Sequence, residues 1–538
     1  MIFLAIYSLL KNCFSINDNN SEGDSMYAEK YAQQCPDRAA FIMASTGVSV
    51  SYKEFEARSN RLAHYLQSQG LVAGDHYSMF MENNEYYLEI CGAGERSGLF
   101  YTCINSYLTP SEAAYIINNS ESKVLFVSPA KLEVAVEALA ECPNIEIVLV
   151  VDSDSSSLPE GMVSYSQAIE ALPSIPIDKQ LLGHSMLYSS GTTGRPKGII
   201  RPLSGQAPDS VLPVFQFLEG ILGYRDDMVY LSPAPLYHSA PQAAINLAIR
   251  RGATVVIMER FDPVEYLRLV EHYQVSHSQL VPTMFSRMLK LSDEERQQYD
   301  LSSMEFAVHA AAPCPEIIKR QMIDWWGPII HEYYGATEGL GFAVCDSHEW
   351  LAHPGTVGKV VAGELSVLDD EMNPSPKGEP GTLWFANGSE FRYFNDPEKT
   401  AEATSPSGEM TTVGDVGYVD EDGFLFLTDR KAFMIISGGV NIYPQESEDL
   451  LISHPKVADA AVFGVPNADF GEEVKAVIQP IDGITGDQSL TEELLQYLGQ
   501  HLSRQKVPRS IDYQLELPRL PTGKLYKRAL RDSYWDEG

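Results

Sequence analysis

Apolar residues occur along the chain in two alternating patterns. Short apolar runs predict buried strands, and longer stretches with apolar residues three or four positions apart predict amphipathic helices. In the stretch 53–69, Phe55, Leu62 and Leu66 share this helical spacing. The runs that predict strands are 123–128, 145–151, 253–258, 275–281, 304–309 and 329–333. Strands that alternate with helices are typical of parallel sheets whose faces are covered by helices.

Capping residues and prolines mark where some of the predicted helices begin. Asp262 can cap a helix that begins at Pro263, because the first helical turn tolerates proline. Pro282 opens a second predicted helix, and a third spans 315–326. Ligands of parallel sheets bind at the carboxyl ends of the strands. We therefore expect a site in the loops that follow these strands.

The pattern changes in the last third of the chain. Around 382–385 and 414–427 the apolar segments shorten and alternate, with glycine and aspartate at the turns. This predicts a small antiparallel or barrel-like module. We expect a boundary near Asp429 and Arg430. Beyond it, strands are predicted at 457–462, 472–479 and 510–515 and a helix at 491–501, which together indicate a compact α+β unit.

A strand predicted at 185–188 leads into a segment, 189–198, with four hydroxyl groups, three glycines and two cations. Glycines let the backbone approach a ligand closely, and free N–H groups, hydroxyls and a lysine together form a polyphosphate cradle. It is not a Walker A loop, because Pro196 replaces the second glycine and Gly198 follows the lysine. A flexible surface loop is the alternative, but the Arg195-Pro196-Lys197 ending argues against it.

This segment resembles the phosphate loop of the adenylate-forming enzymes: acyl-CoA synthetases, aryl-CoA ligases, luciferases and peptide-synthetase adenylation domains. The resemblance implies an α/β multidomain fold. Its large N-terminal domain would contain two helix-covered sheets and the small barrel-like module, and a small mobile α+β domain would follow. It also implies that Thr193 takes part in catalysis and that Lys197 holds the β- and γ-phosphates. The ATP-binding residues implied in this loop are Ser189, Ser190, Gly191, Thr192, Thr193, Gly194 and Lys197.

Two further segments resemble motifs that surround the nucleotide in this family. Tyr334-Gly335-Ala336-Thr337-Glu338 follows a predicted strand. The resemblance implies that Tyr334 stacks on adenine, that Thr337 contacts the α-phosphate and that Glu338 coordinates Mg²⁺, a cation that prefers oxygen ligands. Gly335 belongs to the same ATP site. The small-residue loop with Ala311 and Ala312 resembles the loop beside adenine, although a strand end chosen for tight packing explains it nearly as well.

The segment around His238 resembles the Pro-Leu-x-His motif, in which the histidine lies at the edge of the acyl pocket. A lone histidine is more often structural, so we expect a contact rather than acid–base chemistry. Gly339 and Leu340 are expected to line the same pocket. Small residues after His238 and after Glu338 leave room for a long or bulky apolar acyl group.

Motifs towards the carboxyl end complete the resemblance. Asp415 and Arg430 are expected to bind the ribose, because a carboxylate accepts hydrogen bonds from both hydroxyls. The domain hinge is expected at Lys431 and Ala432, where many relatives carry a charged residue instead of alanine. The glycine turn that admits the CoA arm would be Ser437, Gly438 and Gly439. Lys524 resembles the catalytic lysine that stabilises the adenylation transition state.

Composition narrows the alternatives. The chain is 44% hydrophobic and 21% charged, as expected for an ordered globular protein, and its net charge is −34. This charge argues against binding to nucleic acid or to an anionic membrane surface. Seven scattered cysteines without a Cys-x-x-Cys pair argue for a reducing cytoplasm and against disulfides or a cysteine-built metal site.

The first residues form an apolar run, 1–10, which is too short to span a bilayer and lacks the flanks of a signal peptide. Residues 15–25 are polar. We expect 1–25 to be a disordered extension or the result of a mis-set start, with the working protein beginning at Met26. The N-terminal adenylation domain is then expected at 26–430 and the C-terminal mobile domain at 431–538.

The main hypothesis is an ATP-dependent, AMP-forming acyl-CoA synthetase, an acid–thiol ligase. It would use Mg-ATP to convert a carboxylic acid to acyl-AMP and then form the acyl-CoA thioester. A medium or long fatty acid is favoured, and a cinnamate-like aryl acid is second. The alternatives are an acyl-carrier-protein ligase, an adenylation module of a larger synthetase and an ATP-binding regulator without catalysis. The sequence pattern sets neither the acyl chain length nor the oligomeric state.

Overall fold

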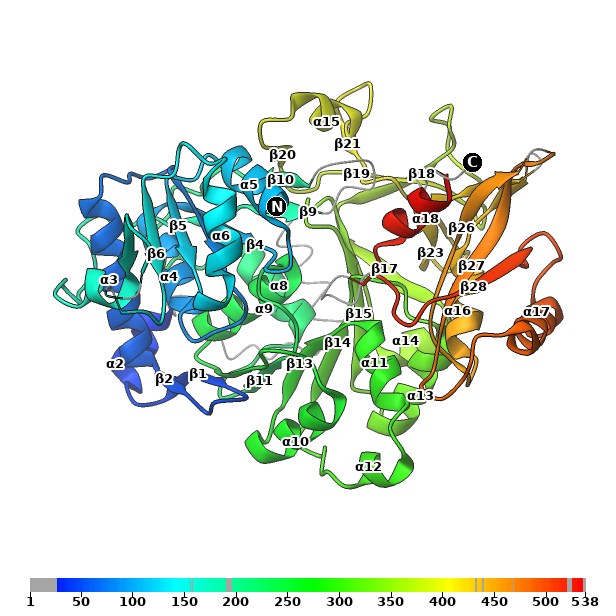
Figure 1. Cartoon of the computed structure of the whole chain (residues 1–538), viewed down its shortest axis with the longest axis horizontal. Coiled ribbons are helices and arrows are strands. Elements are labelled where there is room, and N and C mark those ends of the chain that lie inside the picture. Colours follow the sequence, from blue (N-terminus) through cyan, green and yellow to red (C-terminus); the bar gives the residue numbers. More distant parts are fainter. Residues whose placement is uncertain are drawn as a thin grey trace.

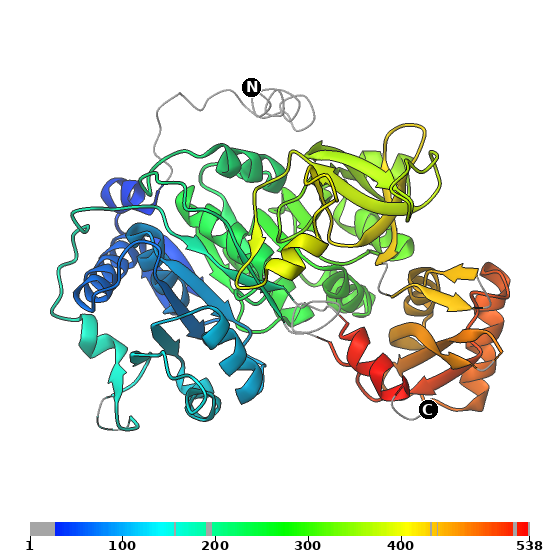
Figure 2. The same cartoon turned by 90° about the horizontal axis from the view of Figure 1, so that it is seen from above.

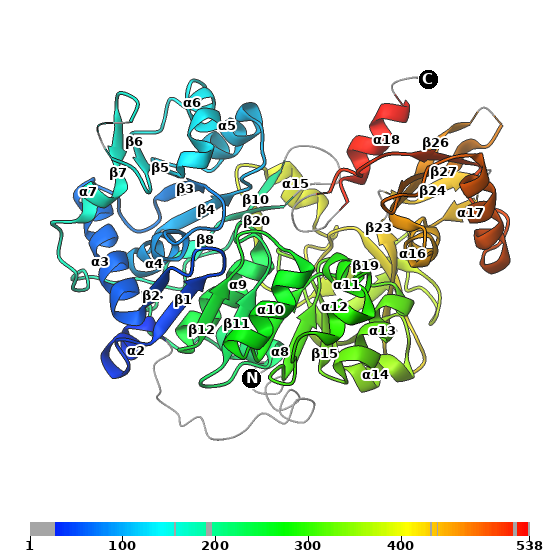
Figure 3. The same ribbon diagram turned by 60° about the horizontal axis from the view of Figure 1, so that its bottom comes forward.

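The computed structural model describes residues 27–154, 156, 158–189, 196–430, 433–437, 440–467, 469–519 and 525–535, with the backbone alone at 429, 430 and 441. Within this part of the chain, no helix is both long enough and apolar enough to cross a bilayer. The described elements form a large N-terminal part and a smaller unit at one end of the molecule (Figures 1, 2 and 3).

The first layer is a parallel sheet with the strand order β7-β6-β5-β3-β4-β8. Its strands are β3 (His76–Phe80), β4 (Phe100–Ile104), β5 (Val124–Val127), β6 (Ile147–Val150), β7 (Met162–Ser164) and β8 (His184–Ser185). The helices in this region are α3 (Tyr52–Ser68), α4 (Tyr87–Ser97), α5 (Pro110–Asn119), α6 (Leu132–Leu139) and α7 (Tyr165–Ile169), with the short helix η1 (Pro129–Lys131) (Figure 1). Buried side chains on both faces explain why the inner strands β5 and β6 are wholly apolar.

The second sheet is parallel from β1 to β15 and then continues with antiparallel strands. Its strands are β1 (Ala39–Met43), β2 (Ser49–Ser51), β11 (Val229–Ser232), β12 (Thr254–Ile257), β13 (His277–Leu280), β14 (Phe306–His309), β15 (Ile330–Gly335), β16 (Phe342–Cys345) and β17 (Thr356–Ala362). The accompanying helices are α2 (Ala28–Gln34), α8 (Pro213–Leu222), α9 (Ser239–Arg250), α10 (Pro263–Tyr273), α11 (Pro282–Leu289), α12 (Asp293–Gln297), α13 (Glu316–Trp326) and α14 (Ser347–Ala352).

An antiparallel β-rich module continues this sheet, because β17 also pairs with β23. The module contains β18 (Glu364–Leu368), β19 (Gly381–Ala386), β21 (Met410–Thr411), β22 (Asp415–Val419) and β23 (Leu425–Arg430). A separate small sheet joins β9 (Leu187–Ser189), β10 (Lys197–Ile200) and β20 (Arg392–Tyr393), and α15 (Pro397–Glu402) follows it. The expected antiparallel module is thus present.

The C-terminal unit is an α+β sheet in the order β25-β24-β27-β26, with β28 parallel to β27. Its elements are β24 (Ile435–Ser437), β25 (Val440–Ile442), α16 (Gln445–Ser453), β26 (Val457–Asn467), β27 (Gly471–Pro480), α17 (Gln488–His501), β28 (Ser510–Tyr513) and α18 (Lys527–Trp535). Helix α16 packs against α13 and β23 of the larger part. In addition, Lys290 after α11 donates hydrogen bonds from Nζ to the carbonyls of Val457 and Ala458, at 3.3 and 2.9 Å.

The predicted α/β architecture is confirmed, and most predicted elements lie within a few residues of the observed ones. Asp262 caps α10 by accepting a hydrogen bond from the Glu265 N–H, as its position before Pro263 predicts. The stretch 185–188 differs from the single strand expected. It is divided between β8, which extends the first sheet, and β9, which pairs with β10, because the chain crosses from one sheet to the other near Met186.

A buried ionic group lies beneath the carboxyl ends of β14 and β15. Lys319 of α13 is 0% exposed, and its Nζ lies 2.5 Å from Oε2 of Glu332 on β15. His309, the last residue of β14, is also fully buried, and its Nε2 lies 3.4 Å from the same carboxylate oxygen. Burial and the neighbouring Lys319 charge hold the pKa of His309 well below its usual value, so this imidazole is neutral.

We predict that Lys319→Met destabilises the protein by about 3–5 kcal/mol, because the Glu332 carboxylate would remain buried without its cation. The midpoint of chemical denaturation measures this loss. The double variant Lys319→Met with Glu332→Met should recover most of it, since an apolar pair carries no buried charge. A loss below about 1 kcal/mol in the single variant would contradict the buried pairing.

A second prediction concerns His76 of β3. Its ring stacks on that of Phe100, and its ring centroid lies 5.1 Å from that of Phe394. Burial lowers the pKa of His76 to about 4, although Glu121 and Asp75 oppose this and Lys123 adds to it. Because the unfolded chain binds the proton first, His76 destabilises the fold as pH falls from 6.5 towards 4.

His76→Phe keeps an aromatic ring in this place and removes the proton-binding site. Between pH 7.5 and pH 5, the wild type should therefore lose about 2 kcal/mol of unfolding free energy relative to His76→Phe. Urea denaturation at the two pH values checks this difference. His272→Phe changes an exposed histidine and is the matched control. Equal pH dependence in the wild type and His76→Phe would show that the imidazole titrates normally.

Candidate active site

Strand β15 carries the aromatic residue of the candidate nucleotide site. The hydroxyl of Tyr334 donates a 2.8 Å hydrogen bond to Oδ2 of Asp415, the first residue of β22. Asp415 is 9% exposed and is the register partner of Arg430 across the β22–β23 ladder. The fold therefore brings Tyr334, Asp415 and the backbone of Arg430 together, and their binding of adenine and ribose remains a prediction.

The turn before Asp415 is fixed by a buried hydroxyl. Oγ1 of Thr412 donates to the Leu383 carbonyl at 2.7 Å and accepts from the Gly414 N–H at 3.0 Å. Gly414 has a φ of +78°, a left-handed conformation that glycine adopts without steric cost. These contacts direct the chain into β22 with the Asp415 carboxylate on the side of Tyr334.

Ala311 and Ala312 lie in the loop after β14, next to β15 in the sheet. Ala311 is exposed and has a φ of +75°, which is uncommon for a residue with a Cβ. Backbone conformations of this kind concentrate at functional sites. Because β14 and β15 are parallel, this loop and the turn after Tyr334 share one edge of the sheet, which is the position expected for a loop beside adenine.

Glu338 lies in the turn after β15 and is 6% exposed. Its Oε1 accepts a 2.9 Å hydrogen bond from the hydroxyl of Tyr393 on β20. The Nζ of Lys197, at the start of β10, lies 4.6 Å from the centre of the Tyr393 ring. Burial lowers the pKa of Lys197, and the nearby Lys399 lowers it further, whereas Glu338 opposes both effects. Tyr393 thus connects the expected metal ligand with the expected phosphate-binding lysine.

A magnesium ion fits the chemistry of this carboxylate. The buried Glu338 carboxyl group supplies a hard oxygen ligand, and Mg²⁺ in nucleotide sites is held by one or two carboxylates together with phosphate oxygens. Tyr393 fixes one oxygen of the carboxylate by its hydrogen bond. The site is therefore suited to an Mg²⁺ ion that arrives with ATP.

Arg201, directly after β10, also reaches the turn that contains Glu338. Its Nη2 donates a hydrogen bond to the carbonyl of Thr337. Burial lowers the pKa of this guanidinium, and the charge of Glu338 partly offsets the effect. The sequence reasoning identified neither Arg201 nor Tyr393, because neither belongs to a recognisable motif and both are brought to the site by the small sheet β9-β10-β20.

The residues expected at the acyl pocket have different surroundings. His238 is the N-cap residue of α9 and is partly buried, with its ring 4.3 Å from that of Tyr237. Gly339 has a φ of +73°. Leu340 is 2% exposed and packs in one cluster with Phe385 and Leu425. The side chain of Leu340 therefore belongs to the core of the β-rich module, and its place in an acyl pocket remains a prediction.

Several predicted residues lie outside the described part of the chain, and their roles remain predictions. They are Ser190, Gly191, Thr192, Thr193 and Gly194 of the phosphate loop, Lys431 and Ala432 of the hinge, Gly438 and Gly439 of the glycine turn, and Lys524. Ser189 and Lys197, which flank the phosphate loop, are register partners in the β9–β10 ladder. Ser437 ends β24 and pairs with Val440 and Gly471.

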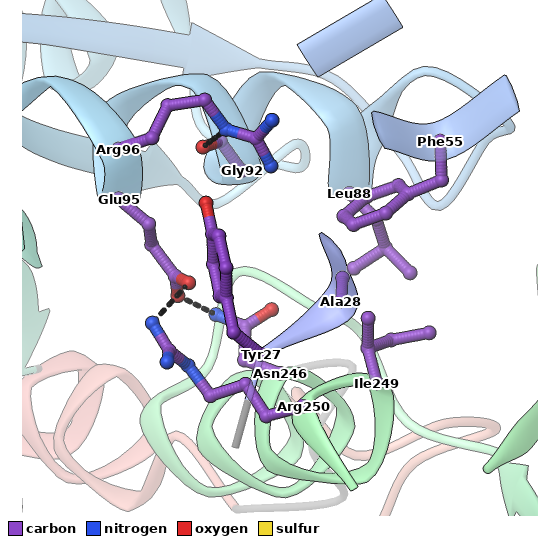
Figure 4. A pocket seen from close by; sticks show the side chains of 10 residues that line it. All are labelled: Tyr27, Ala28, Phe55, Leu88, Gly92, Glu95, Arg96, Asn246, Ile249 and Arg250. Atoms are coloured by element: carbon purple, nitrogen blue, oxygen red, sulfur yellow. Dashed lines mark hydrogen bonds and ion pairs between the residues drawn. The ribbon is translucent and has the colours of Figure 1, made fainter. Parts of the chain in front are cut away.

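A small pocket lies apart from this constellation, among α2, α3, α4 and α9 (Figure 4). Its two guanidinium groups are already paired. Arg96 is bound by Glu56 at 2.9 Å, and Arg250 is bound by Glu95 at 2.9 Å. The ring of Tyr27 lies within 5.5 Å of both guanidinium carbons. These paired charges make the pocket a packing junction rather than a ligand site.

Comparison with known proteins identifies the family of this chain. The family model of the AMP-binding enzyme matches residues 28–392, and that of the AMP-binding enzyme C-terminal domain matches residues 446–524. The solved structure of ATP-bound MatB from Rhodopseudomonas palustris is 28% identical, with a TM-score of 0.77, and the match covers 95% of this chain and 99% of that one.

Three curated relatives match over nearly their whole length. A fatty acid–acyl-carrier-protein ligase from Streptomyces coeruleorubidus is 29% identical over 94% of this chain and 95% of its own. A long-chain-fatty-acid–CoA ligase from Mycobacterium tuberculosis is 28% identical, with 93% and 96% covered. A 4-coumarate–CoA ligase from Oryza sativa is 31% identical, with 92% and 91% covered. The chain belongs to the AMP-binding enzyme family, the adenylate-forming group that includes these acyl-carrier-protein and CoA ligases.

Proposed function

We propose that this protein is an acid–thiol ligase that activates a carboxylic acid with ATP and transfers the acyl group to CoA. The observation that supports it most is the joint placement of Tyr334, Glu338, Asp415 and Lys197, which come from three separate segments. A protein that only packed these segments would not need a buried carboxylate at the hydroxyl of Tyr393 and a lysine at its ring.

The nucleotide would lie along the edge formed by β15 and β22. Tyr334 stacks on adenine, and Asp415 with Arg430 accepts and donates hydrogen bonds at the ribose. Thr337 contacts the α-phosphate, and Lys197 holds the β- and γ-phosphates. When bound, Mg²⁺ neutralises phosphate charge and is held by Glu338, whose orientation Tyr393 fixes.

The reaction would have two steps. A carboxylate oxygen of the acid attacks the α-phosphorus, the bond from this phosphorus to the β-phosphate breaks, and pyrophosphate leaves. The sulfur of CoA then attacks the acyl carbonyl, the bond to AMP breaks, and the thiol proton is released. Two feasible steps replace one difficult condensation. Lys524 would stabilise the charge that develops between carboxylate and α-phosphate in the first step.

A medium or long fatty acid is the favoured substrate. The small Ala240, Ala243 and Ala244 in α9 favour space for an apolar chain, and two of the compared relatives act on fatty acids by name. An aryl acid is the second candidate, because the 4-coumarate–CoA ligase is similarly close. An acyl-carrier protein is the alternative acceptor to CoA.

The test is pyrophosphate release over a panel of fatty, cinnamic and benzoic acids, measured with and without CoA. We expect release with decanoate or a longer fatty acid and an acyl-CoA product when CoA is present. An acyl group that reaches only a carrier protein, or ATP binding without pyrophosphate release for any acid, would contradict the proposal.

A further prediction concerns Lys524. Lys524→Ala should slow acyl-AMP formation at least 100-fold, because the transition-state cation is lost. It should largely spare thioester formation from supplied acyl-AMP, in which that charge does not develop. Single-turnover measurements of the two half-reactions separate these effects. Equal loss in both would show that the lysine has a structural role.

A further inference from the structure

Arg201 occupies the side of the candidate site where the acid substrate is expected. In an extended strand, side chains alternate between the two faces, so Lys197 and Arg201 point to the same side of β10 and its continuation. Four residues of extended chain, at about 3.3 Å per residue, place the Cα atoms of Lys197 and Arg201 about 13 Å apart. Lys197 lies beside Tyr393, whereas Arg201 reaches Thr337 and Gly339. Arg201 is therefore displaced from the expected β- and γ-phosphate position towards the expected acyl pocket.

The guanidinium uses the space that Gly339 leaves open. A Cβ at Gly339 would lie 3.0 Å from Nη2 of Arg201 and 3.1 Å from the Cβ of Ser389. Any larger residue at 339 would therefore press on this guanidinium. Gly339, which is predicted to line the acyl pocket, thus adjoins a cation. The predicted pocket is therefore positively charged where it meets the turn that contains Thr337.

This cation has donors to spare. A guanidinium has five N–H donors, and Arg201 uses Nη2 for the Thr337 carbonyl. Across the residues that the structure describes, Arg201 forms no ion pair. The charge of Glu338 favours the charged form of Arg201, but these two side chains form no ion pair, and Oε1 of Glu338 accepts a hydrogen bond from Tyr393. A largely buried cation is costly without an anion, and a planar carboxylate can accept two parallel hydrogen bonds from a guanidinium.

We propose that Arg201 binds the reacting carboxylate of the acid substrate and holds it beside Thr337 for attack on the α-phosphorus. This inference rests on the proposed function, because it assumes that the acid enters along Gly339 and that Thr337 contacts the α-phosphate. The carboxylate is favoured over a phosphate group, because Arg201 lies next to Gly339 and away from Lys197. Once the acyl-AMP has formed, the carboxylate charge is gone, and Arg201 has no further anionic partner in the acyl group.

The experiment compares the wild type with Arg201→Gln, which retains a donor for the Thr337 carbonyl and removes the charge. With decanoate, or with cinnamate if the panel identifies an aryl acid, KM for the acid should rise about 10- to 100-fold, the effect of losing a charge-assisted pair. The KM for ATP should change less than about threefold, and so should the rate of thioester formation from supplied acyl-AMP, which is within the usual variation of surface substitutions.

A neutral ligand provides a second readout. The wild type should bind decanoate more tightly than decanamide in competition experiments, and Arg201→Gln should lose most of this preference, because the amide carries no charge. Arg201→Lys keeps the cation and should partly restore the KM for the acid. It also keeps the proposal testable if the glutamine variant does not fold. Arg392→Gln changes an exposed arginine on the neighbouring strand β20 and is the matched control.

The outcomes separate the two proposals. No pyrophosphate release by the wild type with any acid of the panel would overturn the proposed function and this inference with it. An active wild type whose Arg201→Gln variant loses affinity for ATP and acid equally would show that Arg201 contacts phosphate or only supports the Thr337 backbone. Equal slowing of both half-reactions in Arg201→Gln would overturn the role of Arg201 in carboxylate binding and leave the proposed function intact.

Discussion

The pairing of β17 with β23 is the constraint on which the candidate nucleotide site depends. This ladder joins the mainly parallel sheet to the antiparallel module, so that Thr356 lies opposite Phe426. As a result, β22 is carried to the edge where β15 ends, and the carboxylate of Asp415 reaches the hydroxyl of Tyr334. Backbone hydrogen bonds, rather than a mobile loop, thus set the distance between the two residues expected to hold adenosine.

The sequence predicted well those elements whose cause is local. Apolar runs located β5, β6, β12 and β14 to within about two residues, which is the usual precision for element boundaries, and a capping aspartate with a following proline located the start of α10. The crossing near Met186 could not be predicted in this way. Both β8 and β9 are extended, and only pairing with distant strands divides them between two sheets.

In the candidate site, too, the sequence predicted the residues that belong to local motifs and missed those that distant contacts bring to the site. Motifs named Tyr334, Glu338, Asp415 and Lys197, because each follows a strand or a glycine-rich turn with the residue types that nucleotides require. They could not name Tyr393 or Arg201. These two act through contacts with residues 55 and 136 positions away in sequence, and no local pattern distinguishes a tyrosine or an arginine in a short strand from any other.

The contact between Lys290 and the C-terminal unit has an evolutionary consequence. Its acceptors are the main-chain carbonyls of Val457 and Ala458, which every residue type provides. Substitutions that preserve the backbone at these two positions therefore leave the acceptors in place, so the side chain that decides this hydrogen-bonding contact is Lys290 of the larger domain. A lineage could replace the whole C-terminal unit by recombination and retain this docking contact without a compensating change in its partner.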